Sequence, residues 1–413
     1  MTTPTAPGLQ VTTDPGEVGL DAGRLRRLDA RCQRWVDEGQ LPGFLVTVAR
    51  HGELVHVGTG GQRDVEAGLP VTPDTIWRIF SMTKPVTSVA AMSLYEEGAF
   101  ELTDPISRWL PEFADTRVYV AGSDQKPVTE PATEPIRVWH LLSHTSGLTY
   151  GFHRAHPVDG MYRNAGHEWG TPPGADSAEV CRQWASMPLV FQPGREWNYG
   201  VSTDVLGRLV ELWAGTDLHE VFAERIYAPL GMTETSFGLA SPDDAGRLAQ
   251  LYGAGVTPLT AFAAAAHQRP AFLSGGGGLV STAGDYLRFV EMLRDGGSTP
   301  DGGRILGPRT LAHMVRNHLP GGADLETYGR PLFAETPLRR VGFGLGFSMV
   351  LDPAAYGVVS SVGDYSWGGA ASTAFYVDPA EDLTVTFYTQ LLPSSTLPIR
   401  PHLRQLVNQS IVD

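Results

Sequence analysis

Lysine is almost absent from this chain of 413 residues. Of its 31 basic residues, only Lys84 and Lys126 are lysines, and the remaining 29 are arginines. Arginine keeps its proton in proteins, whereas a lysine in a desolvated site can lose it. The two lysines are therefore the basic residues to examine for chemistry that an arginine cannot perform.

Cysteines are also few, and the chain has neither an excess of positive charge nor a long apolar run. Each of these features argues against a class of protein. The two cysteines, Cys32 and Cys181, lack C-x-x-C spacing, which argues against a disulfide framework or a zinc site and predicts two buried free thiols. The formal net charge of -14 argues against a nucleic-acid partner, because phosphate backbones are bound by clustered cations.

Two further absences concern membranes and targeting. No run of roughly 18 apolar residues occurs, and the first residues lack a basic start followed by an apolar stretch. We therefore expect a cytoplasmic protein without a membrane partner. The composition leaves the oligomeric state open.

Helix and strand signals along the chain predict a mixed α/β fold. A helical period is readable from Asp21, β-rich runs follow it and return after residue 275, and residues 112–268 are mostly helical patches between loops. We expect an antiparallel sheet flanked by helices and built from both chain ends, with a mainly helical domain inserted. The expected units are a loose N-terminal tail at 1–20, a sheet domain at 21–80 and 275–413, and a helical domain at 81–274.

Several strands of the sheet can be located. A hairpin is predicted around His51 and Gly52, and a second pairs the runs STAFYVDP and LTVTFYTQLL across residues 378–382. The run GGLVSTAGDYLRFVEML is interpreted as part of the same β-structure. The active site is expected in the cleft between the sheet domain and the helical domain.

Ser81-Met82-Thr83-Lys84 places a hydroxyl and an amine three positions apart, so on a helix they share one face. A serine attacks poorly unless a base takes its proton, and a desolvated lysine can be that base. Ser81 follows the apolar run 76–80 and opens a hydrophobic helix, so Lys84 is expected to be buried. The alternative is a core cation held in a salt bridge.

A second Ser-x-x-Lys match, Ser123 to Lys126, serves as an internal control. It lies between Gly122 and Pro127 in a polar stretch, which predicts an exposed loop. We interpret Ser123 and Lys126 as solvated surface residues.

Further motifs resemble a known family over nearly the whole chain. In order, they are the segment around Ser81, LTDPISRWLPEF, LLSHTSGL, PGREWNYGVSTDVLGRLVE, APLGMTETSFG and SGGGGLVSTAGDYLRFVEML. This series resembles the serine β-lactamase-like family, which includes class C β-lactamases, D-alanyl-D-alanine carboxypeptidases and family VIII esterases. The resemblance implies a β-lactamase/transpeptidase-like fold and acyl transfer without a metal or an organic cofactor.

The resemblance also implies a role for Tyr199, in Asn198-Tyr199-Gly200-Val201, as the general acid or base facing Ser81. A phenol relays protons at neutral pH only when a nearby cation favours its ionised form, and Lys84 would be that cation. Two positions after this tyrosine, β-lactamases carry an asparagine. Val201 stands there instead and would line the substrate pocket.

The family's Lys-Thr-Gly motif is replaced here by Trp367-Gly368-Gly369, which is similar to the family VIII esterases. The lysine that helps to hold a substrate carboxylate is therefore missing, and the three residues are expected to line the pocket. The resemblance implies an oxyanion hole made by the backbone N–H groups of Ser81 and Ala370. The arginines suspected of replacing the missing cation are Arg330, Arg339 and Arg340.

Other polar residues have simpler interpretations. His144 is expected to be a hydrogen-bonded core histidine, and Ser146 and Ser202 lack the G-x-S-x-G context of a hydrolase nucleophile. The tetraglycine 275–278 lacks the lysine and the strand-to-helix context of a phosphate-binding loop.

The loop 151–170 contains several histidines whose irregular spacing argues against a metal site. We interpret it as a surface loop flanking the pocket, with aromatic residues that shape an apolar acyl site. The histidines and their acidic neighbour are His153, His156, His167 and Asp159, and the aromatic residues are Tyr150, Phe152 and Trp169.

The sequence thus predicts a serine carboxylesterase that cleaves short-chain or small aromatic esters through an acyl-enzyme on Ser81. Its partner is a small-molecule ester. The alternatives within enzymes are a β-lactamase, a D-amino-acid peptidase or amidase, and an acyltransferase. The alternative outside enzymes is a catalytically silent binding module.

Overall fold

The computed structural model describes residues 9–260, 266–330 and 338–413. Within these ranges, an eight-stranded antiparallel sheet forms the largest layer, which confirms the predicted fold class. In spatial order its strands are β10 (Val341–Phe343), β11 (Ser348–Val350), β12 (Tyr365–Gly368), β13 (Ala374–Asp378), β14 (Leu383–Tyr388), β1 (Gly43–Arg50), β2 (Glu53–Asp64) and β3 (Leu69–Pro70).

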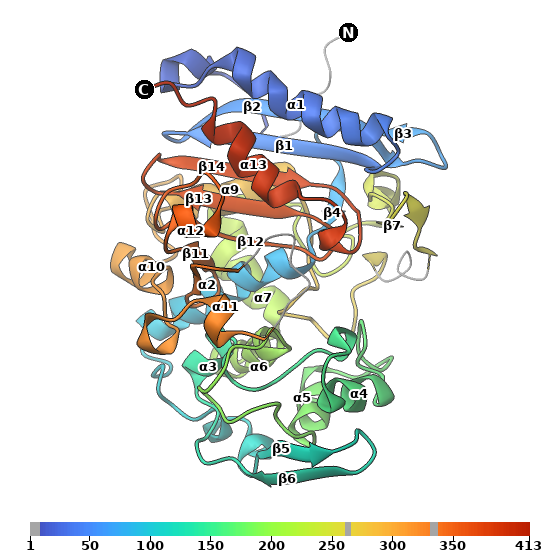
Figure 1. The fold of residues 1–413 in the computed structure, drawn as a ribbon, viewed down its shortest axis with the longest axis vertical. Coiled ribbons are helices and arrows are strands. Elements are labelled where there is room, and N and C mark those ends of the chain that lie inside the picture. Colours follow the sequence, from blue (N-terminus) through green and yellow to red (C-terminus); the bar gives the residue numbers. More distant parts are fainter. Residues whose placement is uncertain (1–8, 261–265, 331–337) are drawn as a thin grey trace.

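The centre of the sheet joins the two ends of the chain. β1 pairs antiparallel with β14, with Val46 opposite Phe387, and Figure 1 shows the blue strand beside the red one. Both predicted hairpins, β1–β2 and β13–β14, are present. Successive side chains of β1 point to opposite faces of the sheet, so Leu45 packs in one hydrophobic cluster and Val46 in another.

One face of the sheet is covered by α1 (Ala22–Asp37) and α13 (Ile399–Asn408). The side chain of Asp21 accepts a hydrogen bond from the N–H of Arg24 at 2.8 Å, so the predicted helix begins where a capping residue stands. The buried stripe of α1 contains Leu25, Leu28, Cys32 and Trp35.

The other face carries α9 (Ala283–Arg294), and here the sequence-based interpretation is wrong. Only Val280–Thr282 forms a strand, β9, and it pairs with β4 (Ile76–Arg78) outside the main sheet. The side chain of Thr282 then caps α9 through the N–H of Asp285. The apolar residues that follow therefore serve a helix that packs on the sheet.

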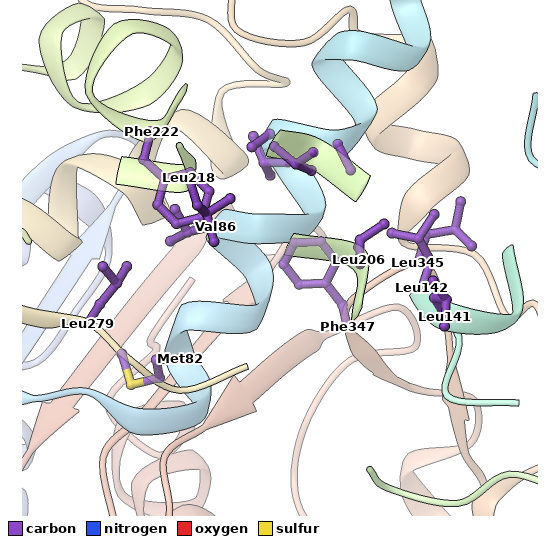
Figure 2. Packing of buried hydrophobic residues seen from close by; sticks show 14 of the residues in the cluster. Met82, Val86, Leu141, Leu142, Leu206, Leu218, Phe222, Leu279, Leu345 and Phe347 are labelled. Carbon is purple, nitrogen blue, oxygen red and sulfur yellow. The ribbon is translucent and has the colours of Figure 1, made fainter. Parts of the chain in front are cut away.

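Helix α2 (Thr83–Glu96) runs through the centre of the molecule. Its residues from Thr83 to Leu94 are buried, as expected for a helix that is apolar on every side. Figure 2 shows Val86 of this helix among Leu218 and Phe222, with Met82 and Leu279 nearby. Packing in the core therefore fixes the position of the first turn of α2, which contains Lys84.

The remaining helices form the lower part of the molecule and its edges (Figure 1). They are α3 (Val138–Leu142), α4 (Pro157–Asn164), α5 (Ser177–Ala185), α6 (Ser202–Ala214), α7 (Leu218–Phe222), α8 (Ala228–Leu230), α10 (Pro308–Met314), α11 (Leu325–Tyr328) and α12 (Pro353–Tyr356). This region also contains two hairpins that the sequence did not predict: β5 (Arg117–Gly122) with β6 (Pro127–Pro131), and β7 (Tyr252–Gly253) with β8 (Thr257–Pro258).

The first and last described residues lie close to the sheet. Pro15–Val18 forms a 3₁₀ turn, and Leu20 is buried and bridges to Ile411, so this part of the expected tail packs on the fold. The first eight residues lie outside the described ranges. The domain boundaries expected from the sequence stay a prediction.

Both cysteines are buried free thiols, as predicted. Burial raises the pKa of Cys32 to about 12 and raises that of Cys181 further. Among the described residues, no helix has both the length and the apolar character needed to cross a membrane.

Candidate active site

Ser81 lies in a 3₁₀ turn, Phe80–Met82, between β4 and α2. The residue before it, Phe80, has a left-handed backbone conformation with φ of 45°. A bulky residue adopts positive φ only under strain, and such strain collects at functional sites. The turn presents Ser81 to a cleft of about 510 Å³.

Lys84 follows one turn later and is only 2% exposed. Its Nζ lies 3.2 Å from the Oγ of Ser81, 3.0 Å from the hydroxyl of Tyr150 and 2.6 Å from the carbonyl oxygen of Gly276. The predicted burial of Lys84 and its contact with Ser81 are therefore present. Its neighbours are a hydroxyl, a phenol and a carbonyl, rather than the carboxylate of a core salt bridge.

The second Ser-x-x-Lys match is placed differently. Ser123 and Lys126 are exposed at the turn between β5 and β6. The N–H of Lys126 donates to the Oγ of Ser123 at 3.2 Å, which is an ordinary turn contact. Identical spacing thus produces a buried pair in one place and a solvated turn in the other.

Tyr199 stacks against the amine of Lys84, whose Nζ lies 4.5 Å from the centre of the tyrosine ring. This is cation–π geometry. The phenolic oxygen of Tyr199 lies 3.4 Å from the indole Nε1 of Trp367 at the edge of the cleft. The structure therefore brings Ser81, Lys84, Tyr199 and Trp367 together.

Tyr150 differs from the sequence-based expectation of a pocket wall. Its hydroxyl contacts the amine of Lys84 directly, and it also interacts with the carboxylate of Asp204. Burial, followed by the charge of Asp204, holds the pKa of Tyr150 well above its usual range. Tyr150 is thus a neutral phenol that belongs to the surroundings of Lys84.

Asp204, in the first turn of α6, is the residue of this site that the sequence analysis missed. Its Oδ1 accepts hydrogen bonds from the Oγ of Ser274 at 2.5 Å and from the N–H of Gly276 at 2.9 Å. Burial raises the pKa of Asp204, while the charge of Lys84 and these hydrogen bonds oppose the shift. No signal in the sequence marks Asp204, because acidic residues are common in the first turn of a helix.

The tetraglycine 275–278 is explained by the same contact. A Cβ on Gly276 would collide with the carboxylate of Asp204, and one on Gly275 would come within 2.8 Å of the carbonyl oxygen of Thr203. The glycines therefore allow the chain to approach α6 closely. This places the carbonyl group of Gly276 against Lys84.

The end of β12 closes the site from the other side. The N–H of Gly369 donates to the carbonyl of Thr373 at 2.8 Å, and the Oγ1 of Thr373 contacts the carbonyl of Ile79 at 3.3 Å. A Cβ on Gly369 would lie 2.5 Å from that same carbonyl oxygen. This close approach brings Ala370 to the cleft that Ser81 also lines.

A row of three stacked aromatic rings leads away from Lys84. Tyr150 stacks on Phe152 at 4.7 Å, and Phe152 stacks on Trp169 at 4.5 Å. All three line the cleft, as do Val201, Gly368 and Gly369. The walls that would surround a substrate are therefore predominantly apolar.

Comparison with known proteins identifies the chain at the level of its family. A model of the Beta-lactamase family matches residues 28–409. The chain belongs to the β-lactamase family. This confirms the resemblance read from the sequence motifs.

Individual known proteins are similar to this chain over nearly its whole length. Esterase EstB of Burkholderia gladioli is 34% identical over 400 residues, which cover 91% of this chain and 93% of that protein. Among solved structures, EstCE1, "a hydrolase with promiscuous acyltransferase activity", has a TM-score of 0.78 at 28% identity and covers 93% of this chain and 98% of its own. Simvastatin synthase (LovD) of Aspergillus terreus has a TM-score of 0.76 at 26% identity, with 94% and 98% covered.

The arginines suspected of replacing the lysine of the β-lactamase motif do not line the cleft. Arg330 pairs with Glu196 at 2.9 Å, and Arg339 and Arg340 are exposed. That choice of residues is wrong, because the arginines that line the cleft are Arg78, Arg400 and Arg404, and the last two belong to α13 at the end of the chain. Arg400 of this helix lines the cleft and donates from Nη2 to the carbonyl of Gly369 at 3.1 Å.

The histidines near the cleft have structural partners. His144 is buried, and burial holds its pKa well below the usual range, so it is neutral. Its Nε2 lies 3.4 Å from the Oγ1 of Thr203, but among the described residues its Nδ1 has no hydrogen-bond partner, so the expected core histidine is only half satisfied. Ser146 and Ser202 are buried and bond to each other at 2.8 Å.

The expectation of a surface loop at 151–170 is wrong, because this segment contains a 3₁₀ turn, Gly151–His153, and helix α4, whose residues Val158 and Tyr162 are buried. The histidines of the segment bind separate groups. His153 contacts the carbonyl of Tyr199 at 2.7 Å, His156 accepts from the N–H of Val158 at 3.2 Å, and His167 contacts Gln183 at 2.7 Å. Asp159 accepts from the hydroxyl of Thr149 at 2.9 Å. In the described part of the chain, no cluster of three metal-ligating side chains forms.

Proposed function

We propose that this β-lactamase-family member is a serine esterase that acts through an acyl-enzyme on Ser81. The observation that carries the proposal is the 3.2 Å contact between the Oγ of Ser81 and the Nζ of a buried lysine, at the wall of an apolar cleft. Esterase EstB, which covers nearly the whole chain, supports the assignment to esters.

In the first half-reaction, the hydroxyl proton of Ser81 passes to the neutral amine of Lys84 as Oγ bonds to the ester carbonyl carbon. The carbonyl oxygen becomes an oxyanion, which the N–H groups of Ser81 and Ala370 would stabilise. The carbon–oxygen bond to the alcohol then breaks, and the alcohol leaves with a proton delivered through Tyr199 and Lys84.

In the second half-reaction, water attacks the acyl-enzyme. The same groups take one proton from the water, the bond to Oγ breaks, and Ser81 recovers its proton. The products are a carboxylic acid and an alcohol, and the amine ends in its starting state. Both tyrosines line the cleft, but the hydroxyl of Tyr150 is engaged by Lys84 and Asp204, so Tyr199 is the one assigned to the leaving group.

The test uses p-nitrophenyl esters of increasing chain length on the wild type, Ser81→Ala and Ser123→Ala. Ser81→Ala should lose on the order of 10⁴-fold or more in kcat/KM, as expected when a nucleophile is removed. Ser123→Ala is the matched control and should stay within about threefold, because surface changes are usually near neutral. Equal losses in both variants would contradict the assignment of Ser81.

An acyltransferase is the second candidate, and the activities named for two structural neighbours favour it. EstCE1 is described as having promiscuous acyltransferase activity, and LovD as simvastatin synthase. An alcohol in place of water would release the acyl group as a new ester through the same chemistry. Adding an alcohol acceptor and quantifying ester against free acid by mass spectrometry separates the two activities.

A further inference from the structure

The amine of Lys84 has three neighbours, and two of them are held by one buried carboxylate. Apart from Ser81, the amine contacts the hydroxyl of Tyr150 and the carbonyl oxygen of Gly276. Asp204 accepts the N–H of that same glycine at 2.9 Å and interacts with that same tyrosine. Asp204 is only 4% exposed.

We infer that Asp204 is a positioning residue that aims the lone pair of Lys84 at Ser81 by fixing Tyr150 and Gly276. The inference rests on the proposed esterase function and adds a residue that does not itself touch the substrate. Ser274 and Gly276 both donate to Oδ1 of Asp204. Because this leaves Oδ2 as an acceptor beside the neutral phenol of Tyr150, we assign the proton of Tyr150 to Oδ2.

The direction of the Lys84 lone pair follows from the number of protons on each group around the amine. Because the proton of Tyr150 is directed to Asp204, the oxygen of Tyr150 accepts from Lys84, and the carbonyl of Gly276 can only accept. A neutral lysine has two N–H bonds, and these two acceptors use both of them. The lone pair is therefore left for the hydroxyl of Ser81.

Proton uptake then requires no rearrangement. When the amine of Lys84 receives the proton of Ser81, its third N–H points back along the same 3.2 Å contact. Its bonds to Tyr150 and Gly276 stay as they were. Such preorganisation matters because a misplacement of about 1 Å in a catalytic group can cost on the order of 10²-fold in rate.

The charge of Asp204 makes a second, separable contribution. The titratable groups around the amine of Lys84 are Asp204, Tyr150, Tyr199 and His144, and the histidine is neutral. A nearby carboxylate favours the protonated amine. Removing this charge should therefore move the acidic limb of the kcat/KM–pH profile to lower pH.

The experiment compares Asp204→Asn with Tyr150→Phe. The asparagine can keep the two hydrogen bonds at Oδ1, but its amide donates toward Tyr150, which then turns its proton onto the lone pair of Lys84. We expect kcat to fall about 10²-fold in Asp204→Asn, with KM within about threefold. Tyr150→Phe should lose activity to a similar degree, and the double variant should lose clearly less than the product of the two single losses.

The matched control is Asp285→Asn. Asp285 is also a buried acid, 2% exposed, and accepts from a hydroxyl, Thr235 at 2.9 Å, and from a backbone N–H, Glu234 at 2.7 Å. Asp285 lies in the first turn of α9, which Thr282 caps, and it is not among the residues that line the cleft. This variant should keep the wild-type kcat and pH profile even if it lowers the melting temperature, which separates a loss of stability from a loss of positioning.

Each outcome decides one statement. Wild-type kcat and an unshifted acidic limb in Asp204→Asn, or fully additive losses with Tyr150→Phe, would overturn the inference. If Asp204→Asn does not fold, Tyr150→Phe provides the test. A kcat near wild type in Tyr150→Phe would also overturn the inference. Failure of the proposed function would give a different result, because the p-nitrophenyl ester assay would then show an active Ser81→Ala variant or an inactive wild type.

Discussion

The indole Nε1 of Trp367 lies 3.4 Å from the phenolic oxygen of Tyr199. An indole nitrogen only donates hydrogen bonds, so the phenolic oxygen is the acceptor. The motif that Trp367 replaces carries a lysine. At this position the chain therefore has a neutral hydrogen-bond donor toward the tyrosine in place of a positive charge.

Trp367→Phe tests the use of this donor. The phenylalanine keeps an aromatic wall but removes the N–H, and a neutral hydrogen bond contributes about 0.5–1.5 kcal/mol, so kcat should fall by up to about tenfold. Tyr199→Phe should fall by roughly 10² to 10⁴, the usual contribution of a positioned acid–base group. In the Tyr199→Phe background, Trp367→Phe should have little further effect on kcat for a p-nitrophenyl ester. A full additional loss there would show that Trp367 does not act through Tyr199.

Lys84→Arg distinguishes a base from a fixed charge. Arginine keeps the positive charge but does not lose its proton at workable pH, so the variant should be nearly as inactive as Lys84→Ala. The measurement is kcat/KM on p-nitrophenyl butyrate, with Lys126→Arg as the exposed control that keeps wild-type activity. Substantial activity in Lys84→Arg would make Lys84 an electrostatic partner and pass the base role to Tyr199.

His140 is expected to make the protein less stable as the pH falls. Burial, reinforced by the charge of Arg137, lowers the pKa of His140 to about 3, and its Nδ1 accepts the N–H of Arg137 at 3.0 Å. In the unfolded chain a histidine takes up its proton near pH 6.5. Protons therefore favour the unfolded state between about pH 6.5 and 3, by up to about 1.4 kcal/mol per pH unit.

His140→Asn keeps an acceptor oxygen near the position of Nδ1 and cannot be protonated. Its melting temperature should fall less than that of the wild type between pH 7 and pH 4.5. The exposed His313 provides the control, since His313→Asn should show the wild-type slope. Equal slopes in the wild type and His140→Asn would mean that His140 is not held neutral.

The missing motif lysine predicts a preference for uncharged esters. A carboxylate entering an apolar cleft loses hydration at a cost of several kcal/mol unless a cation compensates it. Wild-type kcat/KM should therefore be much higher for p-nitrophenyl butyrate than for a chromogenic cephalosporin. Comparable values would refute the esterase assignment and favour a β-lactamase.

We expect Arg400 to contribute to any residual reaction with the cephalosporin, because it lines the cleft and contacts Gly369. Arg400→Met should lower cephalosporin turnover more than ester turnover, since only the former substrate carries a carboxylate. Equal losses would indicate that Arg400 only supports the turn that contains Ala370.

The sequence predicted the parts of the site that are local in the chain. Ser81 and Lys84 are three residues apart, and the apolar residues around them correctly indicated burial. The hairpins β1–β2 and β13–β14 were also found, because alternation and turn residues are short-range signals. The β-structure assigned to the run GGLVSTAGDYLRFVEML, residues 277–293, was wrong beyond Thr282. The β-branched and apolar residues at its start suggested a strand, whereas the Thr282 cap and the spacing of Tyr286, Phe289 and Val290 belong to a helix.

The sequence could not predict the contacts between distant segments. Tyr150, Asp204 and Gly276 come from three separate parts of the chain, and only the tertiary fold brings them around Lys84. Arg400 reaches the cleft from the last helix for the same reason. The positive φ of Phe80 has no local signal either, because glycine or asparagine is the usual sign of that conformation.

The most direct test of the account is to identify the acylated residue. The wild type, mixed rapidly with a slowly hydrolysed p-nitrophenyl ester or with a fluorophosphonate, should gain the mass of one acyl or phosphonyl group, and peptide mapping should place it on Ser81. Ser81→Ala should remain unmodified, and Ser123 should carry no label in either protein. A label on another residue, or ester turnover at the wild-type rate by Ser81→Ala, would contradict an acyl-enzyme on Ser81.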